Sequence, residues 1–79
     1  KHGISFETAI LVFEDPYHLS VQEREVDQEP RWQTIGLVNR MLLVLVAHTV
    51  EEADESETIR IISARKATSH ERRIYAEGI

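Results

Sequence analysis

The feature that most constrains this chain is the run MLLVLVA, residues 41–47, in which every position is apolar. Side chains alternate along a β-strand, so the run has two apolar faces: Met41, Leu43 and Leu45 on one, and Leu42, Val44 and Val46 on the other. Such a strand is stable only when both of its faces are covered. Seven residues cannot cross a membrane, which takes about 20 in a helix. The run therefore predicts the central strand of a sheet with packing on both sides.

Three further segments have β character: YHLSVQ (17–22), RWQTIGLV (31–38) and TIRIISAR (58–65). Asn39 lies between the second of these and the apolar run, which favours a hairpin connection there. Two stretches are too polar to read as strands. EREVDQEPR (23–31), interrupted by Pro30, is predicted to be an exposed loop, and EEADESE (51–57) a solvated turn.

Helices are predicted at both ends of the chain. In KHGISFETAILVFEDP, Ser5 is placed to cap a helix and Pro16 to stop it, with an apolar stripe of Ile4, Phe6, Ala9, Ile10 and Phe13. Near the C-terminus, Thr68 and Glu71 have the spacing of a capping box. Together these elements predict an α+β fold: a small antiparallel sheet of three to four strands, flanked by an N-terminal and a C-terminal helix. Residues 1–79 are expected to form a single domain.

The composition narrows the classes of function. The chain has no cysteine, which excludes disulfides and thiolate metal sites and fits a reducing cytoplasm. His70-Glu71 resembles the start of a zinc-protease helix, but the second histidine is missing because position 74 is Ile. The acidic residues lack the spacing of a calcium loop, and there is no glycine-rich phosphate loop. We therefore expect a cytoplasmic protein that uses neither a metal nor another cofactor.

Charge is divided unevenly along the chain. Residues 1–57 hold four basic and twelve acidic side chains, whereas residues 58–79 hold five basic and two acidic ones, within a net charge of -5. The basic residues are Arg60, Arg65, Lys66, Arg72 and Arg73. Such a split is typical of a protein with one face that attracts phosphates. The alternative is a solvated surface with ordinary salt bridges to EEADESE.

Several side chains could act on a phosphate. Arg65 and Lys66 lie where a strand ends and a helix begins, so they could bind an anion together with the free N–H groups of that helix. His48, at the end of the apolar run, is the strongest candidate for proton transfer, ahead of His2, His18 and His70. Trp32 and Tyr75 could stack on bases, although such aromatic residues are more often part of a core.

Strand alternation limits how these groups combine. In an uninterrupted strand, Arg60 and Lys66 lie on one face and Arg65 on the other. A bend or bulge at Arg65 is needed for all three to converge.

Four segments resemble, in order, those of the BrnT-type ribonuclease toxins of bacterial type II toxin–antitoxin systems: KHGISFETAILVFEDP, RWQTIGLV, LLVLVAHT and IRIISARKATSHERRIYAEG. The resemblance implies a RelE-like fold and a metal-independent endoribonuclease, and it covers nearly the whole chain. Its members usually have an upstream strand and a helix that ends at the KHG of residues 1–3. The chain is thus expected to begin inside the family pattern and to leave one sheet edge open. Its acidity also departs from the usual basic RNA-cleaving protein.

The implied mechanism is attack by the 2′-hydroxyl of the RNA on the adjacent phosphate. We assign His48 as base or acid, and Arg65 and Arg60 as catalytic phosphate-binding groups. Lys66, Arg72, Arg73, Tyr75 and Trp32 are assigned to RNA binding. The implied partners are RNA and a BrnA-type antitoxin, a small DNA-binding protein, in an assembly such as a homodimer or a toxin–antitoxin heterotetramer. The alternative is a catalytically inactive module that binds the antitoxin and acts in operon autoregulation.

Overall fold

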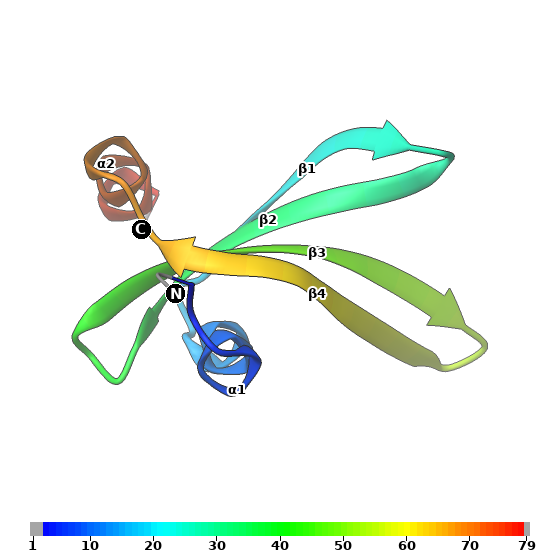
Figure 1. Cartoon of the computed structure of the whole chain (residues 1–79), viewed down its shortest axis with the longest axis horizontal. Helices are drawn as coiled ribbons and strands as arrows, with labels where there is room; N and C mark the ends of the chain where they lie inside the picture. The colour runs from blue at the N-terminus through cyan, green and yellow to red at the C-terminus, as the bar shows by residue number, and fades with distance from the viewer. Residues whose placement is uncertain (1–2, 79) are drawn as a thin grey trace.

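Strand β3 (Leu42–Ala53) lies inside a four-stranded antiparallel sheet, as the apolar run predicts (Figure 1). The computed structural model describes residues 3–78, apart from the side chains of residues 24 and 26. The strands are β1 (Leu19–Val26), β2 (Glu29–Val38), β3 and β4 (Ser56–Lys66), and their order in the sheet is that of the chain. Within the described residues, β1 and β4 are the edge strands. The predicted α+β class is confirmed.

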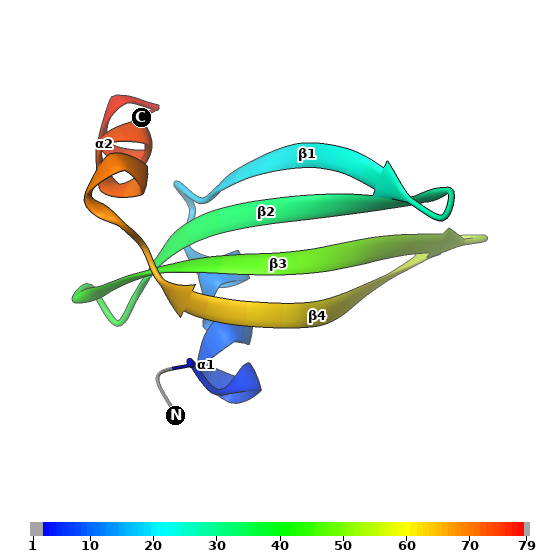
Figure 2. The ribbon, with the colours of Figure 1, turned by 45° about the horizontal axis from the view of Figure 1, so that its top comes forward.

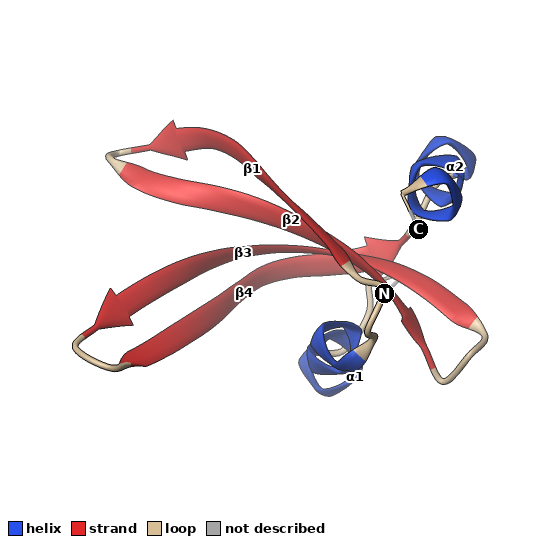
Figure 3. Ribbon diagram, turned by 180° about the vertical axis from the view of Figure 1, so that it is seen from behind, coloured by secondary structure: helices blue, strands red, loops and turns tan. Residues whose placement is uncertain are grey.

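The two helices cover opposite faces of this sheet (Figures 2 and 3). Helix α1 (Phe6–Ile10) continues as a 3₁₀ turn, η1 (Leu11–Glu14), and packs on the face that we call the α1 face. Helix α2 (Ser69–Glu77) packs on the opposite, α2 face, at the end of the sheet far from the β1–β2 and β3–β4 turns. The α2 face is therefore covered by its helix at one end only.

Both faces of β3 are buried. On the α1 face, Val44 and Val46 form a core cluster with Ala9, Val12 and Val38. On the α2 face, Leu43 and Leu45 form a second cluster with Ile35 and Ala67, against which Leu37 and Tyr75 pack. Met41 is the exception: it lies in the turn before β3 and is 86% exposed, so its predicted place on a packed face is wrong.

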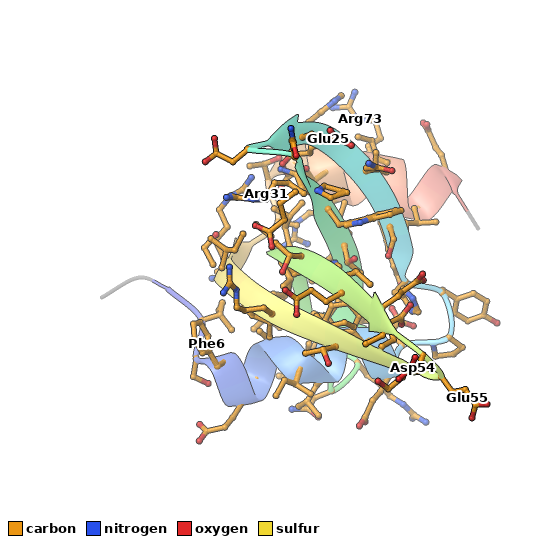
Figure 4. The ribbon with its side chains drawn as sticks, turned by 90° about the vertical axis from the view of Figure 1, so that its right-hand side faces the viewer. Phe6, Glu25, Arg31, Asp54, Glu55 and Arg73 are labelled. Atoms are coloured by element: carbon orange, nitrogen blue, oxygen red, sulfur yellow. The ribbon has the colours of Figure 1, made fainter. Side chains whose placement is uncertain are left out.

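The first helix begins where predicted, because the Ser5 side chain accepts a hydrogen bond from the Thr8 N–H at 3.2 Å. Its predicted apolar stripe is only partly correct. Phe6 and Ile10 are 58% and 53% exposed, and both line an open hollow between α1 and β4 rather than a closed core. Figure 4 labels Phe6 at the start of α1. Val12 takes the buried position instead. Its backbone approaches β2 so closely that a Cβ on Gly36 would lie 2.7 Å from the Val12 carbonyl oxygen.

The predicted hairpin at Asn39 is confirmed, and Asn39 and Arg40 both have positive φ, at 54° and 62°. The expected loop at 23–31 is wrong: β1 and β2 run through it and turn only at Asp27 and Gln28, with φ of 53° and 65°. Consecutive positive φ angles suit the twist of a hairpin with a two-residue turn. Pairing with a neighbouring strand outweighs the polarity of this stretch.

The second polar stretch, 51–57, is also mostly strand rather than a solvated turn. Glu51 pairs with Thr58 and Glu52 with Glu57, and only Asp54 and Glu55 form the turn, which is labelled in Figure 4. Both strands are exposed here, so polar side chains are compatible with them. The β3–β4 hairpin is consequently longer than predicted.

A β-bulge interrupts the pairing of β4 with β3. Ala47 pairs with Ser63, but His48 pairs with Ile61, so Ile62 is an extra residue in β4. Because an extra residue reverses the alternation of side chains, residues on either side of Ile62 change faces relative to a regular strand. The bulge decides which basic residues of β4 share a face.

Candidate functional site

Arg60 and Arg65 lie on the same face of the sheet because of the bulge at Ile62. Arg60 pairs with Thr49 and Arg65 with Leu45, and both partners belong to the α2 face of β3. Lys66 pairs with Val44 and therefore lies on the α1 face. The predicted grouping of Arg60 with Lys66, against Arg65, is thus wrong. The bulge lies at Ile62 rather than at Arg65, and it brings the two arginines to one face without Lys66.

Arg65 is held by Glu71 of α2. Its two terminal nitrogens donate to the two carboxylate oxygens of Glu71, each at 2.9 Å. Glu71 also accepts from the Thr68 N–H at 2.8 Å, while the Thr68 hydroxyl accepts from the Glu71 N–H at 3.2 Å, so the predicted capping box is confirmed. The hydrogen bonds from Arg65, which outweigh the effect of burial, lower the pKa of Glu71 to about 2. Arg65 therefore anchors the start of α2 to β4.

His70 lines a hollow of about 290 Å³ between α2 and the sheet. The other lining residues are Leu19, Val21, Gln33, Ile35, Leu45, Glu71 and Ile74. His70 is exposed, as are Arg72 and Arg73 farther along the helix, and Arg73 extends away from the sheet in Figure 4. The α2 face thus combines an accessible imidazole with Arg60 and Arg65.

His48 lies on the other face and is 2% exposed. It is not at the end of β3, because the strand continues to Ala53. Its Nε2 lies 2.7 Å from the Thr34 hydroxyl, which in turn lies 2.8 Å from the Ser20 hydroxyl. Its Nδ1 lies 3.4 Å from the Thr49 carbonyl, which can only accept, so we place the proton on Nδ1. Burial lowers the pKa of His48, which favours the neutral ring.

A hollow of about 330 Å³ adjoins His48 on the α1 face. Trp32 is half-buried in its wall, and the Phe13 ring meets the His48 ring edge-on, with centroids 5.0 Å apart. Glu52 and Glu57 pair directly across β3 and β4 in the same wall. Two carboxylates repel a phosphate, so this hollow is a poor place for the RNA backbone. His48 and the two arginines do not meet in a common cleft.

Tyr75 contacts the fold rather than solvent. Its hydroxyl donates to Asp15 Oδ2 at 2.5 Å, and the same carboxylate accepts from the backbone N–H groups of Leu37 and Tyr17, at 2.8 and 3.0 Å. Burial first, and then the Asp15 carboxylate, raise the pKa of Tyr75 to about 12. Burial of the Asp15 carboxylate acts to raise the pKa of Asp15, but the hydrogen bonds that the carboxylate accepts outweigh this effect and lower that pKa. Tyr75 therefore ties α2 to β2 and to the end of η1.

No motif in the sequence marks Arg31 or Thr49 as a functional residue. They pair across β2 and β3 on the α2 face, and Thr49 pairs on its other side with Arg60. Arg31 Nε and Thr49 Oγ1 are buried side-chain atoms without a hydrogen-bond partner in the described part of the chain. Only the strand register, which is a non-local property, places these three side chains in one row.

Residues 3–78 contain no group of three or more His, Asp or Glu side chains arranged to hold a metal ion. In the same residues, no helix is long and apolar enough to span a membrane.

A comparison with protein families identifies the chain. Residues 1–71 match the family model of the ribonuclease toxin BrnT of type II toxin–antitoxin systems. No curated protein matches the sequence. The family match covers most of the 79 residues and implies RNA as the substrate class and an antitoxin as the partner. This chain belongs to the BrnT family of type II toxin–antitoxin ribonuclease toxins.

Proposed function

We propose that this protein is a metal-independent endoribonuclease whose RNA-cleaving site lies on the α2 face of the sheet. The observation that carries this proposal is the bulge at Ile62, which brings Arg60 and Arg65 to the face where His70 lines an open hollow. Cleavage without a metal needs groups that transfer protons and groups that stabilise negative charge, and an accessible imidazole and cations can supply these.

In the proposed reaction, the 2′-hydroxyl oxygen of the RNA forms a bond to the adjacent phosphorus, and the bond from phosphorus to the 5′-oxygen breaks. The proton of the 2′-hydroxyl passes to a base, and the leaving oxygen takes up a proton. His70 carries out one of these transfers, a role that typically contributes about 10²- to 10⁴-fold in rate. Arg60 stabilises the negative charge that develops on the phosphate oxygens.

Arg65 acts as a positioning residue in this scheme. Its guanidinium is already bound by both oxygens of Glu71, so it offers less to a phosphate than Arg60, which pairs only loosely with Glu29 at 3.9 Å. By holding the start of α2 against β4, Arg65 fixes the place of His70 on the helix. Arg72 and Arg73, exposed on α2, are proposed to contact RNA or the antitoxin.

The catalytic role of His48 remains a prediction. Burial on the α1 face argues against it, because a buried imidazole cannot reach the RNA. A cleavage assay separates the two imidazoles. The purified protein is incubated in EDTA with a short RNA, and the products are examined for 2′,3′-cyclic phosphate ends. We expect His70→Ala and Arg60→Ala each to reduce the rate at least about tenfold. His48→Gln, with its fold checked by circular dichroism, is expected to reduce it much less.

Loss of cleavage in His48→Gln with an intact fold, together with normal cleavage in His70→Ala, would move the site to the α1 face. Cleavage only when a divalent metal is added would contradict the proposal. If the wild-type protein does not cleave RNA at all, the alternative holds, namely an inactive module that binds the antitoxin and acts in operon autoregulation.

We also propose that a BrnA-type antitoxin neutralises the protein by covering the α2 face, because that face carries Arg60 and His70. Growth arrest upon expression, relieved by co-expression of the neighbouring gene, is the expected result. Light scattering of the purified complex distinguishes a homodimer from a toxin–antitoxin heterotetramer.

A further inference from the structure

Arg31, Thr49 and Arg60 form a row of side chains across three strands of the sheet, and Arg31 and Thr49 have no role in the function proposed above. The three side chains come from three adjacent strands and lie on the α2 face, side by side, since each is paired directly with the next. Directly opposed residues in an antiparallel sheet have Cβ atoms about 4.5–5.5 Å apart. One small ligand can therefore contact all three side chains.

The polar atoms in this row have unused hydrogen-bonding capacity. Thr49 is only 1% exposed, and its hydroxyl has no partner among the described residues. The buried Nε of Arg31 also has no hydrogen-bond partner among the described residues. Buried polar atoms are almost always hydrogen-bonded in folded proteins, so two adjacent exceptions indicate a place where a ligand or ordered solvent completes the bonding.

The hydrogen-bond donors of these three side chains favour an anion as the ligand. Arg31 and Arg60 have only donors, and the Thr49 hydroxyl can donate as well. Two guanidinium groups and a hydroxyl match the several acceptor oxygens of a phosphate. Among the described residues, Arg60 forms one ion pair, with Glu29 at 3.9 Å, and the Arg60 side chain remains 71% exposed. Such a pair is weak and easily displaced by a phosphate.

We propose that Arg31, Thr49 and Arg60 form the principal site for an RNA phosphate, with Arg31 contributing most to its affinity. This inference rests on the proposed function, which it deepens. Gln33, two residues after Arg31 on β2, lines the hollow that also contains His70, so the row adjoins that hollow. Figure 4 shows Arg31 extending from β2 at one side of the sheet, well away from Asp54 and Glu55 at the acidic hairpin tip.

The test measures binding separately from cleavage. A fluorescein-labelled 2′-O-methyl RNA of about 12 nucleotides cannot undergo attack by its 2′-hydroxyl, and its affinity is measured by fluorescence anisotropy at low salt. We expect Arg31→Gln to weaken binding about tenfold or more. Arg31→Lys should keep only part of the wild-type affinity, because lysine has the charge but lacks the planar guanidinium that can bind two phosphate oxygens at once. Thr49→Val is expected to weaken binding severalfold.

Arg40→Gln is the matched control, since it removes the same charge from an exposed arginine in the β2–β3 turn. We expect it to change the affinity less than about twofold. Thr49→Val also controls for folding: removing a hydroxyl that has no partner is expected to leave the urea midpoint equal or higher. If Arg31→Gln and Arg40→Gln weaken binding equally, or if the wild-type protein does not bind this RNA, the inference is wrong.

The two proposals fail in different ways. Binding that depends on Arg31, in a protein that leaves unmodified RNA intact, would overturn the proposed function and keep the phosphate site. Cleavage and binding that are both normal in Arg31→Gln would overturn the phosphate site and keep the function.

Discussion

At the scale of single residues, burial distinguishes two histidines of the same chemistry. His48 is enclosed by Phe13 and Thr34, and its ring nitrogens face groups of the protein. His70 is exposed on α2 beside a hollow. A general base must reach the proton that it removes, so accessibility favours His70 although the position of His48 after the apolar run is the clearer pattern in the sequence. The buried ring of His48 acts on stability instead.

The stability of the protein should depend on the ionisation of His48. Burial lowers the folded-state pKa of His48 below its ordinary value of 6.5, so the unfolded chain takes up a proton more readily than the folded one. The free energy of unfolding is therefore expected to fall as the pH falls below about 6.5. Urea unfolding from pH 7.5 to 5.5 measures this, and His48→Gln should show a smaller decrease. Equal decreases in both proteins would contradict the assignment.

At the scale of elements, the start of α2 depends on one carboxylate that serves two purposes. Glu71 completes the capping box with Thr68 and binds the guanidinium of Arg65 on β4. The local sequence determines the first interaction, and the register of β4 determines the second. Helix α2 is thereby fixed at the end that carries His70.

Replacing Glu71 should destabilise the protein and disturb α2. We expect Glu71→Ala to cost about 1–2 kcal/mol in the free energy of unfolding, since it removes a cap and leaves Arg65 unpaired. Because the pKa of Glu71 is about 2 rather than 4.5, its stabilising effect is full above about pH 4.5 and is lost as the pH falls through about 2. Glu77→Ala, at an exposed position of the same helix, is the control and should change stability by less than about 0.5 kcal/mol. Urea unfolding of both variants at pH 7 measures the difference, and equal stability would contradict the role of Glu71.

At the scale of the whole molecule, the net charge of -5 and the distribution of charge act in opposite directions on RNA binding. Acidic side chains are concentrated in the β3–β4 hairpin, at positions 51, 52, 54, 55 and 57. The α2 face offers two arginines, Arg31 and Arg60, that are not held as Arg65 is by Glu71. RNA is thus expected to bind through few phosphate contacts and against a repulsive overall field.

The salt dependence of RNA binding tests this distribution. Each phosphate neutralised on a single strand contributes about -0.7 to the slope of log K against log salt, so two contacts predict a slope of about -1.4. Fluorescence anisotropy at salt concentrations between about 50 and 200 mM measures this slope. Arg31→Gln should make the slope shallower by about 0.7. A slope of about -3.5 in the wild-type protein would instead match five contacts, with Lys66, Arg72 and Arg73 also neutralising phosphates.

Much of the fold could be predicted because it is encoded locally. The central strand, the Ser5 cap and the Thr68–Glu71 capping box each depend on residues that are near one another in the chain, and each occurs as expected apart from Met41, which lies in the turn before β3. The polar stretches at 23–31 and 51–57 were misjudged because strand pairing at an exposed position has no apolar alternation to reveal it.

The candidate site was less predictable, because it depends on which face each side chain occupies. The sequence by itself determined the fold class, the two helix starts and the central strand, since periodicity and capping act over a few residues. Only the tertiary structure decided that Ile62 is a bulge, that Arg60 faces Arg31 across Thr49, and that His48 is enclosed on the other side. Those outcomes follow from strand register, and a shift of one residue in register moves every later side chain to the opposite face.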